Sequence, residues 1–549
     1  MRTIDKSKIV GEQEHEKRPT LRLIILSALS ALGAGLVASL VASLVMSFLR
    51  LVAGIPTPVE LFGDHVLKTL TVGQFIQLLI RFSPTPKTTP LGLALLAMVG
   101  LGSALGLLYA LITRAKLPAA SARPARKEWL VAAGLALAMT LVGGILFWGE
   151  IAQNLYGLPL QWAMLATLLG LLMEFGCYAV VLCLAYRVLL PRQPARAGAA
   201  SDSGAAEQQA RNNRRQLLAR AGVAVLGVGA AGGSLGLIKG FFNNNASYDG
   251  METFPTKNGF IAPITPNNEH YVVTQNIVDP IVNAGLWRLE VTGLVAHPGT
   301  YTLDELQALP STSRAITLEC ISNGIGGHYI STAVWQGVTM RALLEKHGGA
   351  MPSATYVAFY SVDGYTLSQP LDVVLSADAL LAWRMNGVEL PMRHGYPLRA
   401  LIPGRYGEEN AKWLTRIELT DHFVGGLYAD QGWYNGALHT ITRIDRPFGH
   451  IPLTPTVEIG GLAFAGNRGI QKVEVSVDGG FTWNSAQLQP ALSQDSWVFW
   501  TWQWHPLLPG KYTLAARATD GTGALQTDQK QGTVPNGATG YQVFEVRVG

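Results

Sequence analysis

The segment Ala315-Ile-Thr-Leu-Glu-Cys320-Ile-Ser-Asn-Gly-Ile-Gly-Gly327 joins a run rich in β-forming residues to a glycine-rich turn. This pattern predicts a strand that ends at Cys320, which places the thiol where loops build sites. The other two cysteines, Cys177 and Cys183, lie together in a distant apolar run. Cys320 therefore has no intrachain disulfide partner nearby, and it is either a small buried apolar side chain or a ligand.

The composition of the whole chain indicates a membrane portion joined to other domains. The 549 residues are enough for several domains, and 48% of them are hydrophobic while only 14% are charged. Such a chain is too apolar for disorder or for an ordinary soluble protein. The basic excess behind the net charge of +5 lies before residue 220, and acidic residues outnumber basic ones after it. No nucleic-acid partner is expected, because this distribution fits membrane topology rather than a basic binding surface.

Five apolar runs in a membrane region, residues 1–244, are predicted to cross a lipid bilayer. They are 23–49, 88–113, 129–149, 159–186 and the shorter, Gly-rich run 217–240. The stretch Pro58–Phe82 alternates apolar with polar residues, which favours an interfacial helix. Glu174 is the only carboxylate inside a run, and it is either a functional group or paired with another helix or a lipid headgroup.

The loop charges predict the orientation of these spans. Lysines and arginines concentrate in the N-terminal tail and in the second and fourth loops, for example Arg2, Lys8, Arg18, Arg123, Lys127, Arg196 and Arg211. These segments are expected to face the cytoplasm, so five crossings place everything after about residue 245 on the periplasmic or extracellular side of the cell membrane. Arg214-Arg215 before the fifth run is either such a flank or part of a twin-arginine signal, which exports folded domains.

Further motifs accompany the Cys320 segment. They are Asn268-Glu-His-Tyr271-Val272, Trp287-Arg-Leu-Glu-Val-Thr-Gly293, Val334-Trp-Gln-Gly-Val338, Leu381-Ala-Trp-Arg-Met-Asn-Gly-Val-Glu-Leu-Pro391, His394-Gly-Tyr-Pro-Leu-Arg399, Pro403-Gly404 and Lys412-Trp-Leu414. On these motifs the chain from about residue 265 resembles the sulfite oxidase family of molybdenum enzymes, which includes eukaryotic nitrate reductases and bacterial periplasmic methionine sulfoxide reductases. The resemblance implies an α+β molybdopterin-binding oxidoreductase domain, which we place at 245–444.

The resemblance also implies a cofactor site. Cys320 would be the one protein ligand of molybdenum, with molybdopterin supplying two more sulfurs, and a soft thiolate suits such a metal. Tyr434 matches the active-site tyrosine of the family across a one-residue gap. The positions that match pterin-contacting residues are Asn268, Tyr271, Val272, Asp363, His394, Arg399, Asn410, Ala411 and Lys412. Arginine and lysine suit the cofactor phosphate, whereas Asp363 is alternatively a turn residue.

The C-terminal part, 445–549, predicts a β-sandwich. Short runs such as Gln471–Trp483 and Lys511–Asp520 alternate apolar and polar residues and end in glycine or aspartate turns. They resemble the immunoglobulin-like dimerisation domain of the same family, which implies a homodimer.

The substrate question depends on what is missing. Sulfite oxidases carry arginines where this chain has Val272–Asn276 and Ile321–Gly327, which contain none. Two-electron oxygen-atom transfer with a neutral or weakly charged small molecule, such as a sulfoxide, is therefore favoured over sulfite oxidation, unless Arg405 supplies the missing charge. A metal-free cell-surface binding protein is the remaining alternative. The chain contains no Cys-x-x-Cys-His haem motif, so electrons are expected to pass through an external carrier or the membrane quinone pool.

Overall fold

The computed structural model of the chain describes residues 20–81, 88–115, 117–119, 121–151, 155–158, 160–192, 203–245, 261–275 and 279–549. The chain forms two compact units, which we describe separately. The first comprises Met1–Leu49, Gly92–Leu146 and Leu169–Lys239, and the second comprises Arg50–Leu91, Phe147–Leu168 and Gly240–Gly549. The predicted charges from Arg2 to Arg18, Arg196, and residues 246–260, which follow the predicted domain start at 245, lie outside the described residues.

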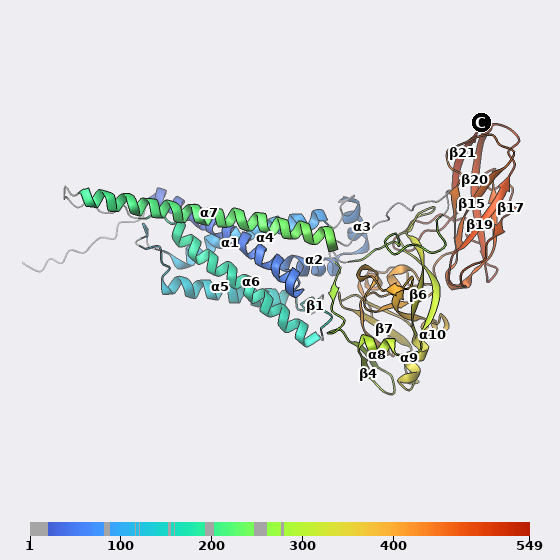
Figure 1. Ribbon diagram of the computed structural model, residues 1–549, viewed down its shortest axis with the longest axis horizontal. Coiled ribbons are helices and arrows are strands. Elements are labelled where there is room, and N and C mark those ends of the chain that lie inside the picture. The colour runs from blue at the N-terminus through green and yellow to red at the C-terminus, as the bar shows by residue number, and fades with distance from the viewer. Residues whose placement is uncertain are drawn as a thin grey trace, which may run out of the picture. The chain divides into compact units, whose positions relative to one another are not determined.

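The first unit is a bundle of long helices (Figure 1). They are α1 (Leu21–Ala53), α4 (Thr88–Thr113), α5 (Arg126–Leu146), α6 (Leu160–Leu189) and α7 (Ser203–Asn245). Each of the five contains a segment long and apolar enough to cross a membrane, and these segments overlap the five predicted runs. The arginines Arg214 and Arg215 lie inside α7, before its apolar part. Glu174 lies in α6 and is 4% exposed.

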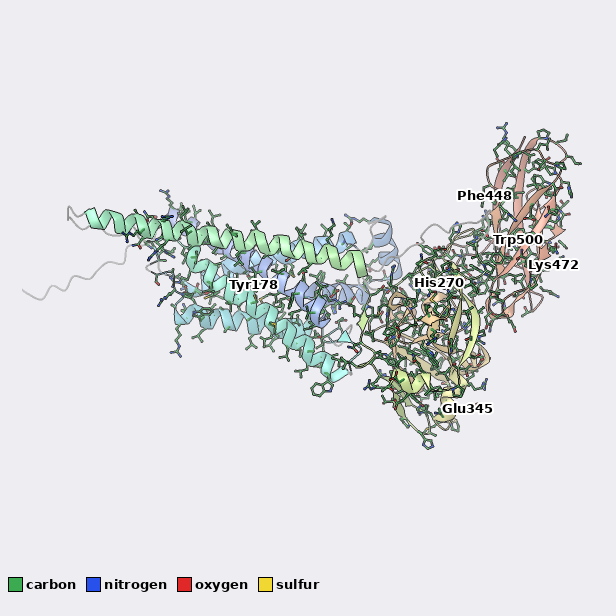
Figure 2. All side chains as sticks on the ribbon, in the orientation of Figure 1. Tyr178, His270, Glu345, Phe448, Lys472 and Trp500 are labelled. Carbon is green, nitrogen blue, oxygen red and sulfur yellow. The ribbon has the colours of Figure 1, made fainter. Side chains whose placement is uncertain are left out.

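Small residues let α1 and α4 approach closely. A Cβ at Gly106 would lie 2.2 Å from the Ala31 carbonyl oxygen, and one at Gly35 would lie 2.6 Å from that of Gly102. Without a hydrophobic driving force between helices in lipid, close backbone packing of this kind holds membrane helices together. Tyr178, labelled in Figure 2, adds a hydrogen bond from its hydroxyl to the Gly102 carbonyl at 2.6 Å.

The second unit contains two short helices where one interfacial helix was expected over Pro58–Phe82. They are α2 (Pro58–Thr69) and α3 (Val72–Arg81), and Phe82 lies outside the described residues. The prediction of a single helix is wrong, because a capping threonine begins a new helix at each of two places. The Thr57 side chain caps α2 in a capping box with Glu60, and Thr71 exchanges two hydrogen bonds with Gln74 of α3.

Two five-stranded sheets form the part of the second unit that carries the sequence motifs. One has the order β10-β9-β6-β5 with β11 paired to β9, and the other has the order β4-β3-β12-β7-β8. Their strands are β3 (Leu289–Gly293), β4 (Gly299–Tyr301), β5 (Thr312–Glu319), β6 (Ile330–Thr339), β7 (Tyr356–Ser361), β8 (Thr366–Pro370), β9 (Leu380–Met385), β10 (Val388–Glu389), β11 (Arg399–Leu401) and β12 (Leu414–Thr420). The short helices α8 (Leu303–Gln307), α9 (Met340–Lys346), α10 (Leu371–Ser376) and α11 (Leu427–Asp430) connect them, which makes this an α+β arrangement.

A segment from between two predicted spans joins this part of the fold. Strand β1 (Leu155–Tyr156) pairs in parallel with β2 (Ile281–Val282). Gly157 follows β1 with φ +77°, and a Cβ there would lie 3.1 Å from both Trp287 and Val282. The loop after α5 is therefore packed against the start of the α+β region.

The C-terminal part is a sandwich of two sheets, as the alternating pattern predicts. Their orders are β13-β15-β19-β18 and β14-β21-β20-β16-β17. The strands are β13 (Ile441–Arg446), β14 (His450–Ile451), β15 (Val457–Phe464), β16 (Ile470–Ser476), β17 (Asn484–Ser485), β18 (Gln487–Leu488), β19 (Val498–Trp504), β20 (Gly510–Asp520) and β21 (Gln542–Val548). Trp500, labelled in Figure 2, is fully buried in its core. The predicted boundary at 444/445 falls inside β13.

Candidate active site

Cys320 lies directly after β5, at the start of the loop that leads to β6. Its backbone N–H donates to the Tyr329 carbonyl at 2.9 Å, and its own carbonyl accepts from Asn323 N–H at 2.9 Å. The Asn323 side chain bonds both Glu319 Oε1 and the Tyr329 N–H at 2.9 Å, which fixes the loop. The Cys320 residue is 6% exposed, with Sγ 2.9 Å from Ser322 Oγ. The predicted position of the thiol at a strand end is thus observed.

The Asn268–Val272 motif brings aromatic residues next to the Cys320 thiol. Tyr271 is buried in the same core cluster as Cys320, and its hydroxyl makes no hydrogen bond to any residue that the structure describes. Burial, followed by the neighbouring Cys320, raises the pKa of Tyr271 well above its ordinary value. His270 stacks on Tyr271 and meets His394 edge to face, with ring centroids 5.2 Å apart. Tyr271 therefore presents an unsatisfied buried hydroxyl next to the metal-ligand candidate.

Arg399 is a buried cation without a buried anion. It is 6% exposed, its Nη1 donates to the His394 carbonyl at 3.2 Å, and its guanidinium lies 5.3 Å from the Trp335 ring centre. Its Nε has no partner, and no ion pair involves it among the residues that the structure describes. Burial lowers the pKa of Arg399 to about 10, so it remains charged at neutral pH. A buried, uncompensated guanidinium requires an anion from elsewhere, which a cofactor phosphate would provide.

His394 and Lys412 lie beside Arg399. His394 Nε2 lies 2.8 Å from the Asn267 carbonyl, and burial lowers the pKa of His394 to about 3, so its imidazole is neutral. The Lys412 ammonium donates to the carbonyls of Val273 and Arg393, each at 3.4 Å. The structure therefore brings together three of the predicted cofactor residues, two of them in the His394–Arg399 motif and Lys412 as the third.

The other predicted positions differ in what they contact. The Asn410 side chain donates to the Tyr406 carbonyl and accepts from the Ile402 N–H, each at 2.7 Å, so it stabilises the loop to which it belongs. Asp363 accepts from the Tyr365 N–H at 3.1 Å, the bond of an aspartate turn. Asn268 is exposed in a turn. Val272 and Ala411 are buried apolar residues.

Tyr434 is not placed at Cys320 by any contact of the described residues. Its hydroxyl donates to the Ala437 carbonyl at 3.0 Å, and its ring stacks on His439. The Tyr406 ring lies 6.4 Å from that of Tyr434. Burial raises the pKa of Tyr406, and the nearby Glu319 carboxyl raises it further. Tyr406 was missed in the sequence although it adjoins Arg405.

Three buried carboxyl groups were also missed. Burial raises the pKa of Glu319 to about 8, and burial together with Glu409 raises that of Glu408 well above its ordinary value. Glu409 pairs with Arg405 at 3.8 Å and accepts from Gln369 at 2.5 Å, yet burial still raises its pKa to about 8. The Glu408-Glu409 doublet inside the motif between Pro403 and Lys412 was the available sequence signal.

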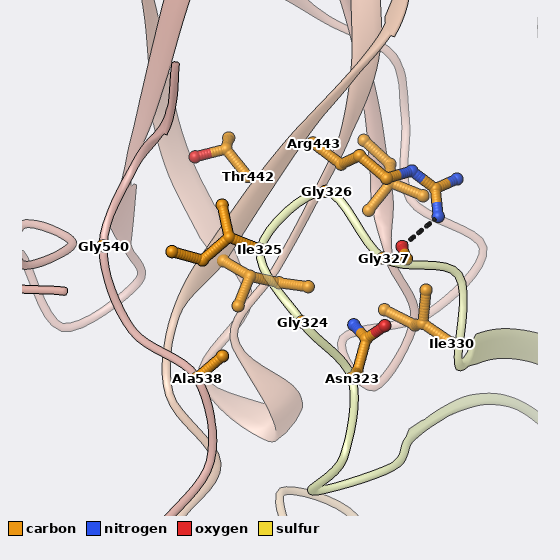
Figure 3. A pocket seen from close by; sticks show the side chains of 12 residues that line it. Asn323, Gly324, Ile325, Gly326, Gly327, Ile330, Thr442, Arg443, Ala538 and Gly540 are labelled. Atoms are coloured by element: carbon orange, nitrogen blue, oxygen red, sulfur yellow. Dashed lines mark hydrogen bonds between the residues drawn. The ribbon is translucent and has the colours of Figure 1, made fainter. Parts of the chain in front are cut away.

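The loop after Cys320 also lines a pocket with the C-terminal sandwich (Figure 3). The lining residues are Asn323, Gly324, Ile325, Gly326, Gly327, Ile330, Ile441, Thr442, Arg443, Leu462, Ala538 and Gly540. Arg443 Nη1 donates to the Gly327 carbonyl at 2.9 Å, and its Nε bonds Asp445 at 2.6 Å. The sandwich thus helps to shape the loop that carries the thiol.

These residues fit a metal that brings its own chelator. Among the described residues, no three His, Cys, Asp or Glu side chains gather as a metal site. A single buried thiol, an unpaired buried guanidinium and an unpaired tyrosine hydroxyl match a metal held by sulfur in a phosphate-bearing organic cofactor.

Comparison with known proteins defines the class. Residues 276–428 match the model of the oxidoreductase molybdopterin binding domain, and residues 443–536 match that of the Mo-co oxidoreductase dimerisation domain. The chain therefore contains a molybdopterin-binding oxidoreductase domain followed by a Mo-co oxidoreductase dimerisation domain, which supports the expected relationship of this region to the sulfite oxidase family.

Two relatives illustrate the similarity. Inducible nitrate reductase (NADH) 1 of Glycine max is 28% identical over 324 residues, which are 47% of this chain and 36% of the relative. Nitrate reductase (NADH) 1 of Oryza sativa subsp. japonica is 30% identical over 324 residues, with 47% and 35% covered. The chain thus spans about a third of the length of these relatives. The crystal structure of the sulfane dehydrogenase SoxCD from Paracoccus pantotrophus matches with 22% identity and a TM-score of 0.48, over 55% of this chain and 87% of that chain.

Proposed function

We propose that the chain is a membrane-anchored molybdenum enzyme that transfers an oxygen atom to or from a neutral or weakly charged substrate such as a sulfoxide. When bound, molybdopterin would supply a metal that exchanges two electrons and an oxygen atom. Cys320 would ligate this metal, and the substrate would bind beside it. Tyr434 would orient the substrate only if the loop that holds its hydroxyl against Ala437 rearranges.

The character of the charged groups around Cys320 carries the substrate proposal. Glu319 precedes Cys320, and both Arg399 and Glu408 act on Tyr271 beside it, so the neighbours are carboxyl groups and the one cation that we assign to the cofactor phosphate. Arg405 makes its described contacts with Glu409 and the Asn435 carbonyl. With Arg399 assigned to the cofactor phosphate, a divalent anion would have to rely on Arg405, which lies against the Glu409 carboxyl and offers one positive charge for two negative ones, and this is costly for a desolvated dianion. Turnover of sulfoxides, sulfite and nitrate with an artificial electron carrier tests this directly, and a higher kcat/KM for sulfite than for a sulfoxide would contradict it.

The cofactor would be held by the buried cations. Arg399, Lys412 and His394 would bind the phosphate and pterin, Asn268, Tyr271, Val272 and Ala411 would line the pterin, and Asp363 and Asn410 would fix the loops around it. The uncompensated charge of Arg399 supports this assignment over a metal-free binding protein, because such a protein gains nothing from a buried cation without a partner.

Replacement of Arg399 by alanine is expected to lower the molybdopterin content of the purified protein. The expected loss is about tenfold or more, since the variant lacks the guanidinium fork that matches a phosphate. The content is measured from the fluorescence of the released, oxidised pterin. Arg416, whose guanidinium lies 3.9 Å from the Tyr360 ring centre, gives the matched control Arg416→Ala. Equal pterin contents in the two variants would reject the role of Arg399.

Sidedness is also part of the proposal. The five membrane-compatible helices and the loop charges support a cytoplasmic N-terminus and an enzyme domain on the outer side. A reporter enzyme that works only outside the cytoplasm, fused after Gly549, is expected to be active, and the same reporter fused after Lys116 is expected to be inactive. The reversed pattern would refute the orientation.

A further inference from the structure

Two segments that follow predicted spans meet in the second unit. Helix α2 follows α1 across Gly54–Thr57, and Phe147–Ile151 directly follow α5. If each span crosses the bilayer, two crossings separate the segments, so both lie on the same side. Their side chains join there: Lys68 Nζ lies 3.0 Å from Glu150 Oε1, and His65 Nδ1 lies 3.6 Å from Glu150 Oε2.

This junction, which we call the His65 site, combines an accessible imidazole with a buried carboxylate. The His65 side chain is 38% exposed, whereas that of Glu150 is 5% exposed. His65 uses one ring nitrogen toward Glu150, and its Nε2 makes no hydrogen bond among the described residues. Phe147 packs edge to face on His65 with ring centroids 5.9 Å apart. An imidazole backed by a carboxylate is a proton acceptor in the manner of catalytic bases.

Aromatic side chains around the site suit an apolar ring rather than a soluble protein partner. Trp148, next to Phe147, is 62% exposed, and Phe62, three residues before His65 in α2, is 50% exposed. Residues three apart lie on one side of a helix. At a membrane surface, exposed aromatic rings of this kind sit at the headgroup level, where a lipid-soluble molecule also reaches.

The same segment contacts the cofactor domain. The Leu70 carbonyl, just after α2, accepts from Gln431 Nε2 at 3.0 Å, and Gln431 Oε1 accepts from Trp433 Nε1 at 3.1 Å. The Trp433 ring lies 4.4 Å from Tyr428.

Tyr428 in turn lies 5.8 Å from Tyr365, which donates to the Glu408 carbonyl at 2.5 Å. Asp64 is adjacent to His65. Burial, then Glu60 and then Asp363 raise the pKa of Asp64 to about 8, so Asp64 lies near Asp363. A continuous set of contacts therefore joins the His65 site to the residues around the cofactor.

We propose that the His65 site binds the headgroup of a membrane hydroquinone and that His65 and Glu150 accept its protons while its electrons pass to the cofactor domain. This inference rests on the proposed function and names the electron donor for it. Hydroquinone oxidation to quinone breaks two O–H bonds and releases two protons and two electrons. Sulfoxide reduction takes up two electrons and two protons, breaks the S–O bond and forms water, so the two half-reactions balance.

Binding is tested on the full chain in lipid nanodiscs, with a short-chain benzoquinone as the probe and tryptophan fluorescence quenching as the readout. The wild type is expected to bind, and His65→Gln is expected to bind about tenfold more weakly because it loses a hydrogen bond to the headgroup. His505→Gln is the matched control, since His505 is an exposed histidine of the sandwich that bonds the Pro455 carbonyl. Absence of quinone binding by the wild type, or equal binding by both variants, would overturn the inference.

Turnover separates the donor site from the enzyme activity. With the corresponding hydroquinone as donor, Glu150→Gln is expected to reduce sulfoxides about tenfold or more slowly than the wild type, with an unchanged rate when a reduced viologen dye replaces the hydroquinone. Equal losses with both donors would show a merely structural role for the ion pair and overturn the inference. A wild type that works with the dye but not with the hydroquinone would also overturn it, and would leave the proposed function standing. Failure with the dye for every oxygen-atom donor would instead refute the proposed function, while quinone binding still tests the His65 site.

Discussion

The Cys320→Ser variant is expected to lose turnover by at least about 100-fold, because oxygen replaces the soft sulfur donor and even indirect changes around a metal can cost this much. The fold should persist. Cys320 donates and accepts backbone bonds that serine also makes, and the Asn323 side chain holds the loop independently of the thiol.

The measurement compares steady-state sulfoxide reduction with an artificial donor, molybdenum content and thermal unfolding. Cys177→Ser is the matched control, since it makes the same atomic change in α6, within the first unit. Full activity of Cys320→Ser at a normal unfolding temperature would remove Cys320 from the chemistry.

The Glu409→Gln variant is expected to gain activity on anions. Glu409 is paired with Arg405 and has a pKa raised to about 8 by burial, so the carboxylate is ionised above this pH and protonated below it. In the wild type the charge of Arg405 is therefore cancelled at about pH 9 and released at about pH 7. The ratio of kcat/KM for nitrate to that for a sulfoxide should rise as the pH falls, because nitrate keeps one negative charge throughout.

In Glu409→Gln this ratio should be raised by about tenfold at pH 9 and should change little with pH, since Arg405 is then never neutralised. In the double variant Arg405→Ala, Glu409→Gln, the nitrate-to-sulfoxide ratio should return to the wild-type value at pH 9. This result would assign the effect to the Arg405–Glu409 pair. Efficient sulfite oxidation by the wild type that collapses in Arg405→Ala alone would show that Arg405 serves as the missing anion-binding arginine, and the neutral-substrate proposal would be wrong.

The sequence predicted the parts of the fold that have a local signal. The run of β-forming residues before Cys320 predicted β5, and long apolar runs predicted the five helices, because the residues of each segment carry these signals themselves. The break at Thr71 between α2 and α3 was missed, since a capping threonine inside an apolar stretch is a weak signal beside the hydrophobic pattern.

For the candidate site, the motifs predicted which residues gather but not how their side chains are oriented or charged. Motif positions pointed to Arg399 and Lys412, and the structure brings them together, whereas the Tyr434 hydroxyl bonds the Ala437 carbonyl and its ring stacks on His439, contacts that no motif encodes. The Glu319 and Glu408 carboxyls acquire their raised pKa from burial by distant segments, and no spacing in the sequence encodes that burial.

The contact between the loop after Cys320 and the sandwich has a consequence for the order of events during synthesis. The loop after the thiol is bonded by Arg443 and walled by Ala538 and Gly540, which the ribosome adds long after Cys320. Domains generally fold as they emerge, N-terminal first, but this loop meets its last neighbours only when β20 has been made and the segment before β21 is in place. If molybdopterin binds only when this loop is complete, its insertion follows translation of the sandwich. A ribosome stalled within the sandwich would then leave a chain that has the Cys320 thiol but lacks the residues that hold the loop after it.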